Sequence, residues 1–461
     1  MIDPYIEAWR LRELIVRKEL RPKEVAEFFL TRIERFNSRL NAFVTVTAER
    51  AFADAVRLEK SDAAAMPLYG VPYSLKDLTS TRGILTTFGS RNFAANVPDA
   101  DAELAVRLHS AGGILLGKTS TPEFGGRPTT EGGLCPPAHN PWNLAHTTGG
   151  SSGGAAAAVA AGFHPLAEGS DGGGSVRIPS ACCGTVGLKP SRGRITLAPI
   201  WGEAWGGLFT NGPIARSVRD AALMLDVMAG EVPGDPYFAP HPARSFQSAL
   251  ERRPGKLHLA TLNRSALGPI EADTLASFET ACEAFRAMGH QLEPINIDPA
   301  ARLAESFGAV VSACIAAVPF KDPELIDPIV RVFYEAGRKM SAPQYVAAQL
   351  EMHNISRTIV QSLMPYDALL TPTLAHPAML IGALPSRRES YVEEALAWLP
   401  FTFPFNATGQ PAISLPNGLS RAGLPIGVQI VGRPNDETGV IALAGAFEEA
   451  RPWRDRHPPL E

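Results

Sequence analysis

The spacing of apolar and polar residues predicts helices and strands that alternate along the chain. Near the start, residues 5–38 fit two helices. Pro22 suits the first turn of the second helix, and Val25, Phe29 and Ile33 fall on one of its faces. This periodicity predicts that the second helix packs one apolar side against a core.

Later segments continue the alternation. Helices are expected over 46–60, 101–112, 155–162 and 271–288, in several pieces between 300 and 363, and over 436–450. Strands are expected just before Lys76 and over 114–116, 165–167, 257–262, 411–415 and 424–432. Intermixed strands and helices predict the α/β class. A long stretch from 121 to 154, rich in glycine, proline and threonine, is predicted as a loop, and loops of that length are often functional.

Composition narrows the class of protein. The chain has 461 residues, of which 45% are hydrophobic and 20% charged, as in ordinary soluble globular proteins. The net charge of −4, without a long basic run, argues against nucleic-acid binding. The first residues lack the apolar segment of a secretory signal, and the longest apolar runs are too short to span a membrane, so the expected location is the cytoplasm. The 5 cysteines, an odd and sparse set, predict reduced thiols rather than a disulfide framework.

Residues 112–119, GGILLGKT, match the phosphate-loop pattern G-x-x-x-x-G-K-[ST]. That loop must expose its backbone N–H groups to phosphate. Here its interior is Ile-Leu-Leu, which suits a buried strand, and Pro122 follows where a helix should begin. The segment is therefore interpreted as a strand followed by a turn.

Two other local patterns are weak. Residues 149–153 fit G-x-S-x-G, but no strand precedes them and no histidine has a distinctive setting, which argues against a Ser-His-Asp triad. Cys135, His139 and His146 are only loosely clustered, and zinc-type spacing is absent from the sequence. We therefore expect no metal site.

A longer combination of motifs is more informative. Lys76 ends the segment GVPYSLKD, and two glycine-flanked serines follow, Ser151 in GGSSGG and Ser175 in GSDGGGSVRIP. Glycine- and serine-rich tracts are usually linkers. Linkers, however, do not contain embedded Asp, Arg and Pro followed by apolar strands. The pattern thus indicates a functional loop system.

In these motifs the chain resembles the amidase signature family. The resemblance extends over about residues 5–455, is thinnest between about 230 and 365, and includes the segments 121–125, 212–216, 370–373, 406–412 and 423–429. It implies an α/β/α sandwich around a large twisted mixed sheet. It also implies a single domain over 1–461, with a catalytic core at about 65–220 and a variable helical region at about 230–365.

The resemblance assigns roles to three residues. Ser175 would be the nucleophile, Ser151 the proton-relaying serine held in a cis peptide, and Lys76 the base. Hydrolysis of an amide requires an activated nucleophile, and a buried lysine can act as a base when desolvation leaves it neutral. The oxyanion hole is expected from the backbone N–H groups of Gly172, Gly173 and Gly174, together with that of Ser175. Supporting contacts are expected from Ser152, Asp171 and Arg177.

Some positions depart from the family pattern. Glu168 stands where members usually have an apolar residue, and Gly172 replaces a position that often carries a larger one, which could widen the acyl pocket. The tract 126–138 is also unusual. In the segment 201–209, three aromatic residues either line the substrate cleft or pack in the core: Trp201, Trp205 and Phe209.

The expected activity is transfer of an acyl group from a small-molecule amide to water, without a metal or organic cofactor. Two alternatives remain open. The same core could hydrolyse carbamates (urethanes) or esters, with aryl compounds as possible substrates. The chain could also be a partner-dependent amidotransferase subunit. A monomer or homodimer is expected, with no nucleic-acid or membrane partner.

Overall fold

The computed structural model describes residues 2–63, 65–385 and 388–460. Within these residues, an 11-stranded sheet has the order β1-β3-β2-β6-β8-β7-β12-β13-β11-β9-β10. Its strands, in that order, are Phe43–Val46, Ile114–Thr119, Pro72–Lys76, Leu166–Asp171, Thr210–Ala215, Val186–Lys189, Ala412–Leu419, Pro425–Gly432, Ala368–Pro372, His258–Thr261 and Gln291–Pro294. One sheet therefore links segments from both ends of the chain.

The sheet is mixed, as expected. Strands β3, β2 and β6 pair in parallel, and so do β11, β9 and β10. The strands from β6 through β8, β7, β12 and β13 to β11 pair antiparallel, and β1 joins β3 antiparallel. The carboxyl ends of β2 and β6 consequently lie at one edge of the sheet, where both strands lead into the motif loops.

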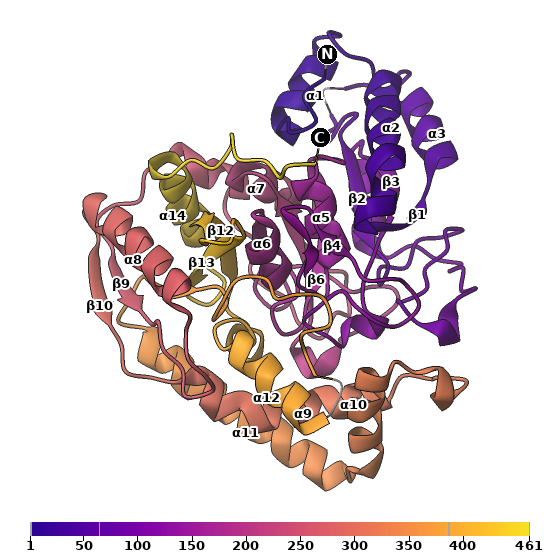
Figure 1. Ribbon diagram of the computed structural model, residues 1–461. Helices are drawn as coiled ribbons and strands as arrows, with labels where there is room; N and C mark the ends of the chain where they lie inside the picture. Colours follow the sequence, from indigo (N-terminus) through magenta and orange to yellow (C-terminus); the bar gives the residue numbers. More distant parts are fainter. Residues whose placement is uncertain (1, 64, 386–387, 461) are drawn as a thin grey trace.

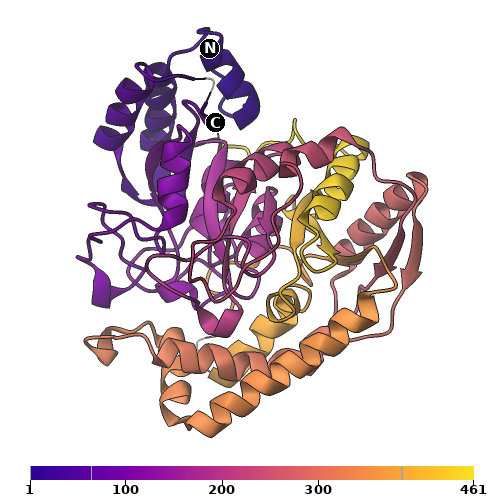
Figure 2. The ribbon, with the colours of Figure 1, turned by 180° about the vertical axis from the view of Figure 1, so that it is seen from behind.

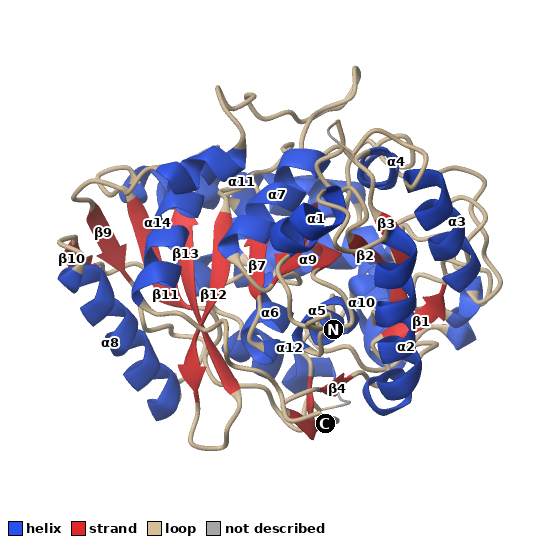
Figure 3. Cartoon of the chain, turned by 90° about the horizontal axis from the view of Figure 1, so that it is seen from above, coloured by secondary structure: helices blue, strands red, loops and turns tan. Residues whose placement is uncertain are grey.

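Helices cover both faces of this sheet (Figure 1; Figure 3). Side chains alternate between the two faces along a strand. In β3, Ile114 and Leu116 join one apolar core, whereas Leu115 joins the other. The first core includes residues of α2 (Pro22–Leu40), α3 (Ala48–Leu58), α5 (Gly153–Ala160), α6 (Arg177–Cys183), α9 (Pro299–Ala316) and α11 (Ala342–Leu363). The second includes residues of α1 (Ala8–Val16), α4 (Glu103–Ser110), α7 (Val218–Met228), α8 (Ala272–Ala287) and α14 (Glu437–Ala450). The α/β/α arrangement is confirmed.

A group of helices lies apart from the strands. In both Figure 1 and Figure 2, α9, α10 (Pro328–Lys339) and α11 form the orange layer at the lower edge of the molecule. Two further helices, α12 (Arg388–Trp398) and α13 (Pro404–Ala407), lie between β11 and β12 in the chain. Among the described helices, none is both long and apolar enough to cross a membrane.

The structure differs from the sequence-based expectations in a few places. The strand predicted at 114–116 continues to Thr119, so the phosphate-loop match lies largely within β3, where every residue is buried. The predicted loop from 121 to 154 contains a small hairpin, formed by β4 (His139–Asn140) and β5 (Asn143–Thr147). Strands β1, β7, β8, β10 and β11 were not predicted. Of these, β7, β8 and β11 are buried throughout and so lack the alternation of a half-buried strand.

Candidate active site

Lys76 is the last residue of β2, a strand buried over its whole length between β3 and β6. Its side chain is fully buried. Its Nζ donates hydrogen bonds to Ser151 Oγ at 2.7 Å and to Ser170 Oγ at 2.9 Å. The amine therefore ends among hydroxyl groups, with water largely excluded.

Burial lowers the pKa of Lys76 to about 7, because a charged amine is poorly solvated in this setting. The carboxylates of Glu168 and Asp171 act in the opposite direction and raise this pKa. A lysine with a pKa near neutrality carries a free lone pair in a large share of molecules at pH 7. It can therefore accept a proton, which an ordinary surface lysine cannot.

Two other lysines in the sheet are also fully buried. Burial lowers the pKa of Lys118 to about 8 and that of Lys189 to about 7. The Nζ of Lys118 donates to the Thr79 carbonyl and to the hydroxyl of Thr81, and the Nζ of Lys189 donates to the Pro190 carbonyl at 2.8 Å. Lys76 differs from both in its contact with Ser151.

Ser151 follows a cis peptide bond at Gly150–Ser151, and α5 begins two residues later. Its Oγ receives the Lys76 hydrogen bond, and Gly125 lies so close that a Cβ there would be 2.9 Å from this oxygen. The neighbouring Ser152 Oγ accepts the N–H of Ser170 at 3.1 Å and donates to its carbonyl at 3.1 Å. Ser152 thus ties this turn to β6.

Ser175 lies in the loop between β6 and α6, and 9% of its surface is exposed. Its carbonyl accepts the N–H of Ser152 at 3.2 Å, which places the two serine loops in contact. The Gly174 N–H donates to Asp171 Oδ1 at 2.7 Å, so this amide already has an acceptor. Gly173 and Ser175, by contrast, donate no backbone N–H hydrogen bond within the described part of the chain.

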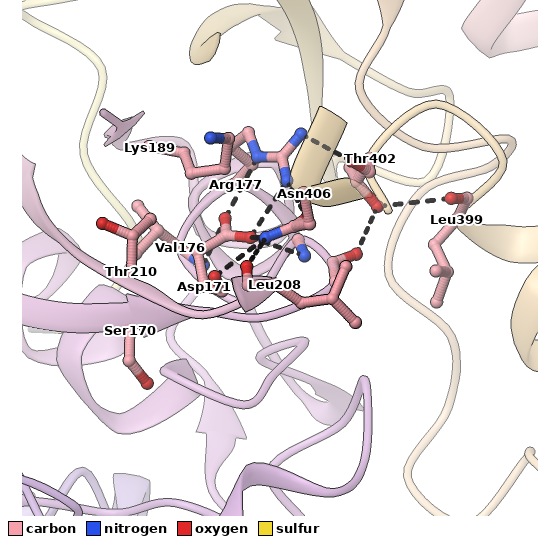
Figure 4. A network of polar contacts seen from close by, with 12 residues as sticks. Ser170, Asp171, Val176, Arg177, Lys189, Leu208, Thr210, Leu399, Thr402 and Asn406 are labelled. Atoms are coloured by element: carbon pink, nitrogen blue, oxygen red, sulfur yellow. Dashed lines mark hydrogen bonds and ion pairs between the residues drawn. The ribbon is translucent and has the colours of Figure 1, made fainter. Parts of the chain in front are cut away.

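The Ser175 loop is held by the buried ion pair of Asp171 and Arg177 (Figure 4). The Arg177 Nε donates to Asp171 Oδ2 at 3.0 Å and its second terminal nitrogen to Oδ1 at 2.9 Å. Asp171 Oδ2 also accepts the Val176 N–H at 3.1 Å. Burial alone would raise the pKa of Asp171, but the adjacent guanidinium lowers it to about 2. Asp171 and Arg177 thus hold the backbone of the Ser175 loop.

Residues remote in sequence complete the loop, and sequence reasoning assigned them no role. Asn406 Nδ2 donates to the Asp171 carbonyl at 2.8 Å, and Thr402 Oγ1 donates to the Gly173 carbonyl at 2.9 Å. Gln429 Oε1 accepts from Arg177 at 2.7 Å. Asn406 and Gln429 belong to segments that resembled the family, but only the fold shows that they meet Arg177 and Asp171.

Two cavities meet at Trp205, and one of them borders Ser175. The smaller, of about 100 Å³, is lined by Ser175 and Gly173, by Phe307 and Val311 of α9, and by Tyr391 and other residues of α12. The larger, of about 340 Å³, falls within the size range of small-molecule sites. Its aromatic lining comprises Phe88, Phe93, Phe124, Trp201, Trp205 and Phe209.

The three aromatic residues singled out in the sequence thus border a cavity, although Trp201 is 53% exposed. Trp205 lines both cavities and lies between them. A Cβ at Gly172 would lie 2.8 Å from the Trp205 ring, so the absence of a side chain at this position makes room for that ring. The other three phenylalanines of the larger cavity, Phe88, Phe93 and Phe124, lie in turns and short 3-10 helices and were not predicted.

Cys135, His139 and His146 form the weak cluster noted in the sequence. Among the described residues, no group of three histidine, cysteine, aspartate or glutamate side chains is arranged to hold a metal ion. His139 Nδ1 lies 2.6 Å from the Leu144 carbonyl within the small hairpin.

Comparison with known proteins agrees with this architecture. A family model described as Amidase matches residues 24–441. An acylamidase from Rhodococcus erythropolis is 37% identical, over 98% of this chain and 97% of the relative. Among solved structures, 6-aminohexanoate cyclic dimer hydrolase complexed with substrate has a TM-score of 0.94 at 32% identity, covering 100% of both chains. A bacterial aryl acylamidase has a TM-score of 0.89 at 28% identity, covering 97% of both. The chain therefore belongs to the amidase signature family of amide-hydrolysing enzymes.

Proposed function

We propose that this protein is a serine amidase in which Ser175 attacks the carbonyl carbon of a small-molecule amide. The observation that carries the proposal is the 2.7 Å separation of Lys76 Nζ and Ser151 Oγ, both buried, because it allows a neutral amine to accept the Ser151 proton. The Ser151 loop in turn contacts the Ser175 loop. A serine hydroxyl is barely ionised at neutral pH and needs a base to become a nucleophile. Neutral Lys76 supplies that base through Ser151.

In the acylation step, the Ser175 Oγ–C bond forms as the Ser175 proton moves to Ser151 Oγ. The Ser151 proton moves at the same time to Lys76 Nζ. The tetrahedral intermediate then collapses, the C–N bond breaks, and the leaving amine takes a proton back through the same relay. Water repeats the sequence on the acyl-enzyme, which releases the acid and restores Ser175.

The oxyanion that forms during attack needs donors that are already in place. We assign this role to the backbone N–H groups of Gly173 and Ser175, with Gly172 beside them. Gly174 fits this role less well than the sequence suggested, because its N–H is bonded to Asp171. Each well-placed donor contributes about 3 kcal/mol in comparable hydrolases.

The central test is hydrolysis of a chromogenic anilide by the purified chain alone. Ser175→Ala and Lys76→Ala are each expected to lower kcat by at least about a thousandfold. Ser362→Ala, an exposed serine on α11, is the matched control and should retain activity. Activity of Ser175→Ala would refute the proposal, and rescue of Lys76→Ala by high pH alone would indicate another base.

The same assay separates the rival function. A partner-dependent amidotransferase subunit would leave the anilide intact when assayed alone. Turnover by the isolated chain therefore supports the hydrolase, and complete inactivity of a folded preparation supports the rival.

The larger cavity favours an aromatic or flat apolar group in the substrate. Its six aromatic side chains offer faces and edges on which a ring can pack. Because Ser175 attacks the acyl carbon whichever group leaves, the same site could also hydrolyse aryl carbamates and esters. Trp205→Ala should raise KM for aryl amides by about tenfold while affecting alkyl amides less. Equal effects on both classes would contradict an aryl site. A panel of aryl amides, carbamates, esters and primary amides then ranks the leaving groups.

A further inference from the structure

Glu168 is a fully buried carboxylic acid in β6, next to the strand that carries Lys76. Its Oε2 accepts the backbone N–H of Lys76 at 2.8 Å and the hydroxyl of Thr79 at 3.0 Å. Its other oxygen, Oε1, is buried without a hydrogen-bond partner among the described residues. A buried carboxyl group with an unpartnered oxygen is costly, so its presence calls for a functional reason.

The charges around Glu168 come from its own strand β6, from the adjacent strand β2 and from β3 beyond it. The ammonium groups of Lys76 in β2 and Lys118 in β3 both act on its carboxylate. Asp171, at the end of β6, adds a second negative charge that acts on Lys76. Asp77, which follows β2, acts on Lys118. Two buried bases and three buried acids therefore form one electrostatic cluster.

We propose that Glu168 is a positioning residue for the reaction. It fixes the backbone of Lys76 through the N–H···Oε2 bond, and its charge sets the pH range in which the Lys76–Ser151 relay can accept a proton. This inference rests on the proposed function, in which neutral Lys76 is the base. Glu168 acts only through Lys76 and touches neither substrate nor the reacting serines.

The direction of the effect follows from the signs of the charges. A carboxylate near an amine stabilises the ammonium form, so Glu168 raises the pKa of Lys76 and opposes the effect of burial. Burial raises the pKa of Glu168 itself, while the two hydrogen bonds to Oε2 and the two lysines favour its ionised form. Removing this negative charge should lower the pKa of Lys76. More of the lysine would then be neutral at lower pH.

The test is Glu168→Gln, which retains an oxygen that can accept the Lys76 N–H but carries no charge. The pH dependence of kcat/KM for a chromogenic anilide is measured for the wild type and the variant. The fall of kcat/KM at low pH, the acid limb, is then compared. We expect the limb of the variant to move to lower pH by about one unit. Glu448→Gln is the matched control, because Glu448 also accepts a backbone N–H, that of Val218, but lies in α14 away from the site. Its limb should coincide with that of the wild type.

A second variant covers the case in which Glu168→Gln does not fold. Glu168→Asp keeps the charge but draws the carboxylate away from the Lys76 amide. It should lower the rate at high pH while leaving the limb near its wild-type position. A limb that stays fixed in Glu168→Gln, or that moves equally in Glu168→Asp, overturns the inference.

The proposed function and the role of Glu168 can fail separately. If Lys76→Ala stays active, the proposed function fails, whatever Glu168 does. If Lys76→Ala is inactive and the limb of Glu168→Gln is unmoved, only the role of Glu168 is wrong.

Discussion

Replacing Arg177 with methionine removes a buried guanidinium but keeps a side chain of similar length. In the native structure this group donates five hydrogen bonds, two to Asp171 and one each to Thr402, Gln429 and Asn406. The substitution leaves the Asp171 carboxylate buried without its cation. It also removes the donor to three acceptor groups, the Thr402 carbonyl, Gln429 Oε1 and Asn406 Oδ1.

The expected cost follows from these contacts. Breaking a fully buried ion pair by removing one partner costs about 3–5 kcal/mol, because a charge stays buried and uncompensated. Asp171 keeps donors from Gly174, Val176 and Asn406, which favours the lower end of that range. Each orphaned acceptor adds about 1 kcal/mol. We therefore expect Arg177→Met to lower the free energy of unfolding by about 6 kcal/mol.

Urea denaturation followed by fluorescence and circular dichroism measures this loss. Arg244→Met is the control, since Arg244 pairs with Glu251 on the surface and its removal should cost no more than about 1 kcal/mol. Adding Asp171→Asn to Arg177→Met should recover part of the loss, because the buried charge is then gone. A loss for Arg177→Met equal to that of Arg244→Met, or no recovery in the double variant, would refute the reasoning.

Other expectations concern the relay and its surroundings. Because the base must be neutral, kcat/KM should rise as the pH increases through about 7, and a flat pH profile would contradict the role of Lys76. Ser170→Ala removes the second hydrogen bond to Lys76 Nζ and should lower kcat by about tenfold with KM little changed, as steady-state kinetics can show. Gly125→Ala places a Cβ 2.9 Å from Ser151 Oγ at a backbone φ of 69°, so its anilide turnover should fall well below that of Gly255→Ala, where the space is open. Gly172→Ala should displace the Trp205 ring and raise KM for aryl amides more than for alkyl amides.

Much of the fold could be predicted from the sequence because its signals are local. The face formed by Val25, Phe29 and Ile33 repeats every three to four residues, and it is buried in α2 as expected. The apolar interior of 112–119 was sufficient to reject a phosphate loop. In both cases the residues that carry the signal lie close together in the sequence.

The parts of the site that escaped prediction depend on tertiary contacts. Nothing near Asn406 or Thr402 in the sequence indicates that they reach the loop of Gly173 and Asp171. Ser170 was visible within its motif, but its contact with Lys76 depends on the pairing of β2 with β6. Phe88, Phe93 and Phe124 of the larger cavity lie in turns and short 3-10 helices, which have no apolar periodicity to mark them. Such residues acquire a role only when the sheet brings distant segments together.

The arrangement around Arg177 also affects when the enzyme can become active during its synthesis. The partners of this guanidinium extend from residue 171 to residue 429. A nascent chain that has left the ribosome only as far as β8 contains Lys76, Ser151 and Ser175, but lacks the carbonyl and amide groups that close the loop around them. The Ser175 loop therefore lacks part of its support until β13 has emerged, so a truncated product would carry all three proposed catalytic residues without an intact site.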